Sequence, residues 1–116
     1  MNREINFYVN DIDDIRIASD TFNGTLTALK RNRLFAGREG EGLATRLIFT
    51  FSSDLDTYTK SLVVDGTGVS LTALDDTWYY DLPSATMTAE TVKVVVKAVL
   101  STQTLLSKPI WLEVKR

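Results

Sequence analysis

The stretches TVKVVVKAVL (Thr91–Leu100) and IWLEVK (Ile110–Lys115) decide the fold class of this chain. In both stretches apolar side chains occupy every second position, and residues such as Lys93 and Glu113 fall between them. A period of two indicates a β-strand, because a helix would scatter the same valines around its whole circumference. We therefore predict that the chain ends in two half-buried antiparallel strands joined by a polar connection.

The same alternation recurs in shorter stretches along the rest of the chain. It is clear in residues 5–9, 45–51, 69–73 and 78–82, and Pro83 ends the last of these because proline cannot donate to a strand ladder. The side chains predicted to be largely buried are Leu47, Phe49, Phe51, Val94, Val96, Leu112 and Val114.

Turn and loop sequences separate these stretches. Asn23-Gly24 and residues 65–68 are typical of tight hairpin turns, in which central residues need a positive φ. The basic, glycine-containing stretch 30–42 is predicted to be a loop, and no amphipathic helical period of ten or more residues occurs. The sequence thus predicts an all-β antiparallel sandwich of seven to nine strands, immunoglobulin-like or jelly-roll, with a closed barrel as the alternative.

The composition is that of one globular domain spanning residues 1–116, with 44% hydrophobic and 24% charged residues. The net charge is −2 and both signs are spread along the chain, so we expect binding to neither nucleic acid nor an anionic membrane. No stretch approaches the roughly 20 apolar residues of a membrane span. No signal-peptide pattern follows Met1, so we expect synthesis in a cytoplasm-like compartment.

The residue types also limit the chemistry. Cysteine and histidine are absent, which removes disulfides, thiolate nucleophiles, imidazole bases and the usual zinc ligands. The glycines of residues 37–42 lack the lysine of a phosphate-binding loop. The acidic segments 11–14, 54–56 and 75–76 would suit calcium or the paired carboxylates of a small hydrolase if they met at one end, but aspartate is also ordinary in turns. We expect no catalytic residues, no cofactor and no metal ligands.

Trp78, Tyr79 and Tyr80 form an aromatic cluster. Their alternation places Trp78 and Tyr80 on one face of a strand and Tyr79 on the other. Core packing is the predicted role of the inward face, because large aromatic side chains dominate core burial. The alternative is a sugar-stacking platform, as in a carbohydrate-binding β-sandwich module.

Val95, Val99 and Trp111 fall on the outward face of the two final strands, among lysines. If the turn between these strands is centred near Gln103, Val95 lies opposite Trp111 and Lys93 lies opposite Glu113. A solvated face does not usually contain a tryptophan, so the three residues are candidates for an interface with another subunit. The alternative is that a loop covers them.

Four segments together resemble a known family. In order and approximate spacing they are similar to the N-terminal β-sandwich domain of tail and baseplate proteins of phages that infect Gram-positive bacteria, of which the baseplate upper proteins are the best known. The resemblance runs from about Gly40 to the C-terminus, some two thirds of the chain. The segments are 40–51 (GEGLATRLIFTF), 58–64 (YTKSLVV), 80–83 (YDLP) and 107–114 (SKPIWLEV).

The resemblance implies a non-enzymatic structural role in virion assembly. Such a domain docks onto the tail core, and in longer members a C-terminal part carries or contacts the receptor-binding proteins. Here the sequence ends where the sandwich would end, so the chain is expected to be a small tail protein or the N-terminal part of a longer one. The implied partners are other tail or baseplate proteins or a second copy of the chain, and the implied location is the virion tail after assembly in the bacterial cytoplasm.

Overall fold

The computed structural model of the chain describes residues 3–20, 34–88 and 90–116, and the regular structure of these residues is β apart from one short 3-10 turn. The predicted turn at Asn23-Gly24 lies outside the described residues. The elements are β1 (Arg3–Asp11), β2 (Asp14–Asp20), β3 (Leu34–Arg38), β4 (Thr45–Phe51), the 3-10 turn η1 (Ser53–Leu55), β5 (Thr59–Val64), β6 (Thr67–Ser70), β7 (Thr72–Leu74), β8 (Thr77–Asp81), β9 (Thr91–Leu100), β10 (Gln103–Leu106) and β11 (Ile110–Lys115).

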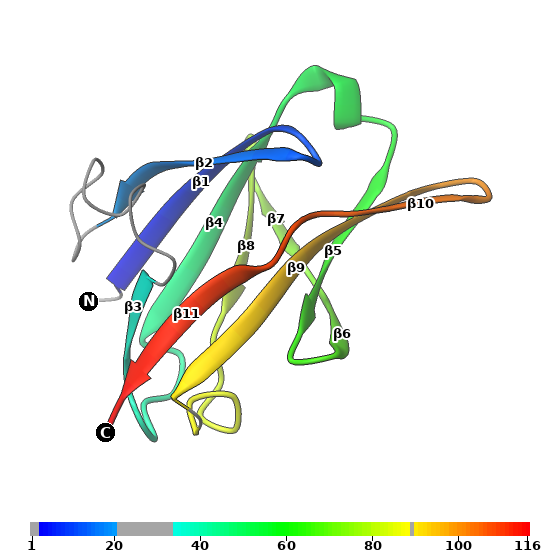
Figure 1. Cartoon of the computed structure of the whole chain (residues 1–116). Coiled ribbons are helices and arrows are strands. Elements are labelled where there is room, and N and C mark those ends of the chain that lie inside the picture. The colour runs from blue at the N-terminus through cyan, green and yellow to red at the C-terminus, as the bar shows by residue number, and fades with distance from the viewer. Residues whose placement is uncertain (1–2, 21–33, 89) are drawn as a thin grey trace.

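Two sheets pack face to face, which confirms the predicted β-sandwich (Figure 1). Sheet A has the strand order β2-β1-β4-β8-β7, and sheet B has the order β3-β11-β9-β5-β6, with β10 also paired to β9. Within the described residues there are eleven strands rather than seven to nine. Both sheets are mixed, because β1 lies parallel to β4 and β3 lies parallel to β11, while the other pairs are antiparallel.

The order of the central strands is that of an immunoglobulin sandwich. In that fold one sheet contains strands B, E and D, and the other contains G, F, C and, in variable-type domains, C′. Strands β4-β8-β7 and β11-β9-β5-β6 reproduce these two orders along the chain as well as in space. The structure therefore matches the immunoglobulin-like arrangement, with β1 and β2 extending sheet A beyond it.

The core lies between the sheets and contains six of the seven side chains predicted to be buried. The exception is Phe51, which is only partly buried at the end of β4 and packs against the core from its margin. Phe49 is completely buried, and its ring stacks on that of Phe7 with centroids 5.0 Å apart. These two rings join neighbouring strands, because Phe7 and Phe49 are partners in the β1–β4 ladder.

The prediction of a loop over residues 30–42 is wrong for residues 34–38, where Leu34–Arg38 forms β3. This strand pairs with β11, from a distant part of the chain, and it buries Leu34 and Ala36 against the core. The Thr45 hydroxyl donates to the Ala36 carbonyl over 2.5 Å and so links β4 of sheet A to β3 of sheet B. Strand β3 has only five residues and is held by contacts with distant parts of the chain. Its local sequence therefore shows almost no period-two pattern from which the strand could be predicted.

Residues 69–73, predicted as one strand, belong to two strands in different sheets. Strand β6 ends at Ser70 in sheet B, and β7 begins at Thr72 in sheet A. Leu71 lies between them with its side chain buried, so the chain crosses from one sheet to the other at this residue. The apolar alternation continues through the crossing, which is why the sequence pattern does not reveal it.

The C-terminal hairpin has a different register from the predicted one. Its turn lies at Ser101-Thr102, where Ser101 has φ 55°, and β10 pairs back along β9 from there. Ser107 lies after β10 and before β11, both of which pair with β9. The Val96 N–H donates to the Ser107 hydroxyl, and the Ser107 N–H donates to the Val96 carbonyl, each over 2.9 Å. Beyond Ser107, Trp111 lies opposite Lys93, not opposite Val95.

Candidate functional site

The outward face of sheet B carries a line of apolar side chains, Val63, Val95, Val99 and Trp111, which we call the outer strip. Val95 is the cross-strand partner of Val63, and Trp111 is the partner of Lys93, one position further along the same face of β9. From the position of Trp111 opposite Lys93 to Val99, the strip extends along six residue spacings of β9, or about 20 Å at the usual rise of a strand. The indole of Trp111 is 40% exposed, whereas the three valines are half-buried. The three candidate interface residues thus share one face.

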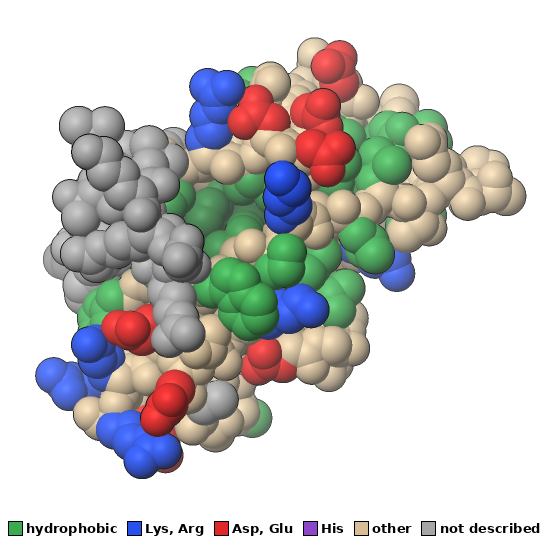
Figure 2. Space-filling view, in the orientation of Figure 1, with side chains coloured by type: hydrophobic (Ala, Val, Ile, Leu, Met, Phe, Trp, Pro, Cys, Tyr) green, Lys and Arg blue, Asp and Glu red, His purple; other side chains and the backbone are tan. Residues whose placement is uncertain are grey.

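Lysines are interleaved with the side chains of this strip. Lys93 and Lys97 alternate with Val95 and Val99 along the outward face of β9. Within the part of the chain that the structure describes, neither ammonium group takes part in an ion pair. Figure 2 shows hydrophobic side chains gathered over β11 and β9, with basic side chains beside them. An apolar strip with unpaired ammonium groups among its side chains suits a partner surface that combines apolar groups with carboxylates.

The three residues of the aromatic cluster do not form a common platform. Trp78 and Tyr80 point inward from β8 and pack against the core, as predicted. Tyr79 points outward, and the guanidinium of Arg46 lies 3.8 Å above the centre of its ring. Arg46 is held there by two hydrogen bonds to Asp81, of 2.8 and 3.1 Å, which also raise the pKa of the guanidinium. The exposed aromatic face is therefore already occupied by a protein cation.

Lys60 is a buried cation that the sequence reasoning missed. Its ammonium lies 5.5 Å from the centre of the Phe51 ring and 5.2 Å from that of the Trp78 ring. It donates to the carbonyls of Asp56 over 3.4 Å and Tyr58 over 3.1 Å, which follow the η1 turn. The signal was its inward position, in line with Leu62 and Val64 on β5. The ammonium of Lys60 thus contacts two backbone carbonyls and two aromatic rings at this end of the sandwich.

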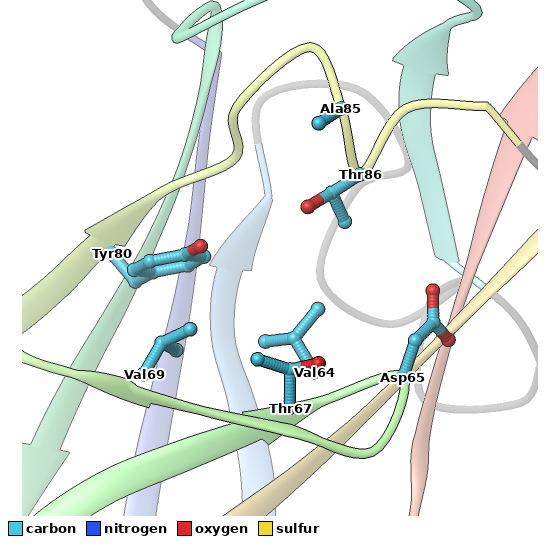
Figure 3. A pocket seen from close by; sticks show the side chains of 7 residues that line it. All are labelled: Val64, Asp65, Thr67, Val69, Tyr80, Ala85 and Thr86. Carbon is cyan, nitrogen blue, oxygen red and sulfur yellow. The ribbon is translucent and has the colours of Figure 1, made fainter.

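A small cleft opens beside β8, where β6 and β7 diverge. Figure 3 shows the Tyr80 ring reaching from β8 toward Thr86, above the side chains of the β5–β6 hairpin. Burial raises the pKa of the Tyr80 hydroxyl. The cleft has a volume of about 260 Å³, which is below the usual range of ligand pockets. It is lined by Val64, Asp65, Thr67, Val69, Tyr80, Ala85 and Thr86.

The acidic segments 11–14, 54–56 and 75–76 do come together at one end of the sandwich, because Val9 pairs with Phe51 in β4 and Trp78 pairs with Phe49. Acidic side chains gather at the top of the molecule in Figure 2. Among the described residues, however, no group of three or more carboxylates is arranged to hold a metal ion.

The glycine-containing stretch 37–42 holds an ion-pair cluster. The carboxylate of Glu41 accepts hydrogen bonds from the Arg3 guanidinium, one of them 2.8 Å long, and from the Arg38 backbone N–H over 2.7 Å. These donors, the Arg3 side chain foremost, lower the pKa of Glu41 to about 2. Gly37 has φ 131°, and a Cβ at this position would lie 2.5 Å from the Glu41 carboxylate. The Glu41 carboxylate thus ties β1 to β3.

Comparisons with models of protein families, with curated proteins and with solved structures give no match to this chain. Among residues 3–20, 34–88 and 90–116, no helix is long and apolar enough to cross a membrane.

Proposed function

We propose that this chain is a non-enzymatic assembly module of a phage or prophage tail, which attaches to other tail or baseplate proteins through the outer strip. The resemblance of residues 40–51, 58–64, 80–83 and 107–114 to baseplate domains supports the tail assignment. The observation that carries the attachment role is the exposed Trp111 on the outward face of sheet B, opposite Lys93. The site of action is then the virion tail, reached by assembly in the host cytoplasm.

Trp111 has enough exposed surface to act as an anchor. A tryptophan side chain buries up to about 250 Å², of which 40% is still exposed in this chain. Covering about 100 Å² of apolar surface contributes about 2.5 kcal/mol, the magnitude of a binding hot spot. The interleaved Lys93 and Lys97 would increase the association rate with a partner that carries carboxylates, and would make that rate dependent on salt.

The test is co-expression of the chain with the proteins encoded beside it, followed by affinity measurements on any complex that co-purifies. Trp111→Ala is expected to weaken the complex by about 60-fold, which is the loss of about 2.5 kcal/mol converted to affinity. Tyr8→Ala is the matched control, because Tyr8 is also an aromatic on an outward face, with 38% exposure, but lies on sheet A. Equal losses for the two variants would refute attachment through the outer strip.

A charge-reversal variant separates binding from folding. Lys93→Glu with Lys97→Glu changes two exposed or half-exposed groups and leaves the core untouched. We expect the thermal melting of this variant to stay close to that of the unmodified chain, while association with the partner slows and no longer decreases with added salt, because screening now weakens a repulsion. An unchanged association rate would refute the proposed role of Lys93 and Lys97 in binding the partner. If the chain forms no complex with the proteins encoded beside it, the proposed role in a phage tail is refuted.

A further inference from the structure

Strand β10 has one unpaired edge. Within the described residues its only partner is β9, and the hairpin closes with Gln103 opposite Leu100. Antiparallel ladders alternate, so Gln103 and Leu105 direct their backbone groups to β9, while Thr104 and Leu106 direct theirs away from it. The hairpin projects at the right of Figure 1, and Leu106 is 56% exposed. The outward N–H and C=O groups of two residues are thus available to another strand.

The other outermost strands of the described sheets carry features that oppose pairing. Strand β2 contains Asp14 and Arg16, and its register with β1 shifts twice. Strand β3 contains Gly37 with positive φ, β6 has four residues including the exposed Gly68, and β7 has only three residues. Charges, irregular register and shortness are the usual protections of a sheet edge. Residues 99–107 contain no charge, proline or glycine, and β10 pairs with β9 without a register shift.

We propose that the partner of this edge is β10 of a second copy of the chain, so that sheet B continues from one molecule into the next. The segment is complementary to itself when it is paired antiparallel about a twofold axis through Leu105. Thr104 then lies opposite Leu106 of the second copy, and each such pair exchanges two backbone hydrogen bonds. The two Leu105 side chains face each other across the axis. Because the segment is uncharged, this register places no like charges opposite one another.

The predicted contact is small. It comprises the backbone bonds of a four-residue strand and the apolar contacts of Leu105 and Leu106, well below the area of about 1,200 Å² that stable complexes bury. The isolated chain should therefore dimerise weakly, with a dimer fraction that rises as the concentration of the chain rises. In an assembly that holds several copies together, the same contact becomes intramolecular and is strengthened by the high effective concentration. This inference concerns the edge of sheet B and does not depend on the outer strip.

Site-directed cross-linking tests the register, because the chain has no native cysteine. In a non-hydrogen-bonded pair opposite Cα atoms lie about 4.5 Å apart, within the range for a disulfide, so Leu105→Cys should give a covalent dimer on mild oxidation. Thr104→Cys is the matched control, since the two copies of this residue would lie about 8 Å apart, beyond disulfide reach. Equal cross-linking of the two variants, or none for Leu105→Cys, would overturn the proposed register.

Proline substitution tests the edge without relying on a cysteine. Leu106→Pro removes an outward N–H but no bond to β9, so the fold should persist while sedimentation equilibrium at about 0.1 to 1 mM shows at least a tenfold weaker dimer. Ser70→Pro, at an outward position of β6 on the opposite edge of sheet B, should leave dimerisation unchanged, as should Trp111→Ala. A dimer unaffected by Leu106→Pro, or a chain that stays monomeric throughout this concentration range, would overturn the proposal.

Discussion

Truncation of Phe49 to alanine tests whether the stacked rings between the sheets hold the sandwich together. Phe49 has no exposed surface, and it stacks on Phe7 at 5.0 Å and on Phe51 at 6.2 Å. Burial of about 200 Å² at about 25 cal/mol per Å² sets an upper value near 5 kcal/mol, and measured truncations of buried phenylalanine cost about 3 to 5 kcal/mol. We expect Phe49→Ala to lower the free energy of unfolding by this amount.

The assay is urea denaturation followed by far-ultraviolet circular dichroism. For a chain of this length each kcal/mol shifts the melting temperature by about 4 °C, so a decrease of about 12 to 20 °C should accompany the lower urea midpoint. Phe51→Ala is the control, because Phe51 is only partly buried at the end of the same strand and should cost about half as much. A loss below about 1 kcal/mol for Phe49→Ala would refute the described core.

Two further predictions concern the ion-pair cluster that links β1 to β3. The folded pKa of Glu41 is about 2 instead of 4.5, so its contribution to stability is present above about pH 4.5 and is lost as the pH falls toward 2; acid titration of the melting temperature should be less steep in this window for Glu41→Gln. Gly37→Ala should cost about 1 to 3 kcal/mol in urea melts, because the new methyl group would displace the Glu41 carboxylate at a strained φ. Gly66→Ala, where φ is 86° but the space beyond is open, should cost less, and the reverse order would contradict the steric part of this argument.

For the outer strip, the sequence predicted the face on which the side chains lie but not their neighbours on the adjacent strands. The alternation of Val95 and Val99 with Lys93 and Lys97 was enough to place the valines on an outward face, and the structure places them there with Trp111. The neighbours across the strand were predicted incorrectly, because they depend on a turn at Ser101-Thr102 and on an interruption at Ser107 that no local pattern announces. A displacement of two residues in the register keeps each side chain on its face and changes only its partner.

The sequence by itself determined the strands whose two faces meet different environments. Thr45–Phe51, Thr91–Leu100 and Ile110–Lys115 have the predicted bounds, since each has one face in the core and one outside it, and a period of two records that difference. Only the tertiary structure decided the parallel pairing of β3 with β11, the crossing between sheets at Leu71 and the free edge of β10. Alternation specifies which way a side chain points, whereas the partner of a strand depends on loop closure and on competition among all the edges of the folded chain.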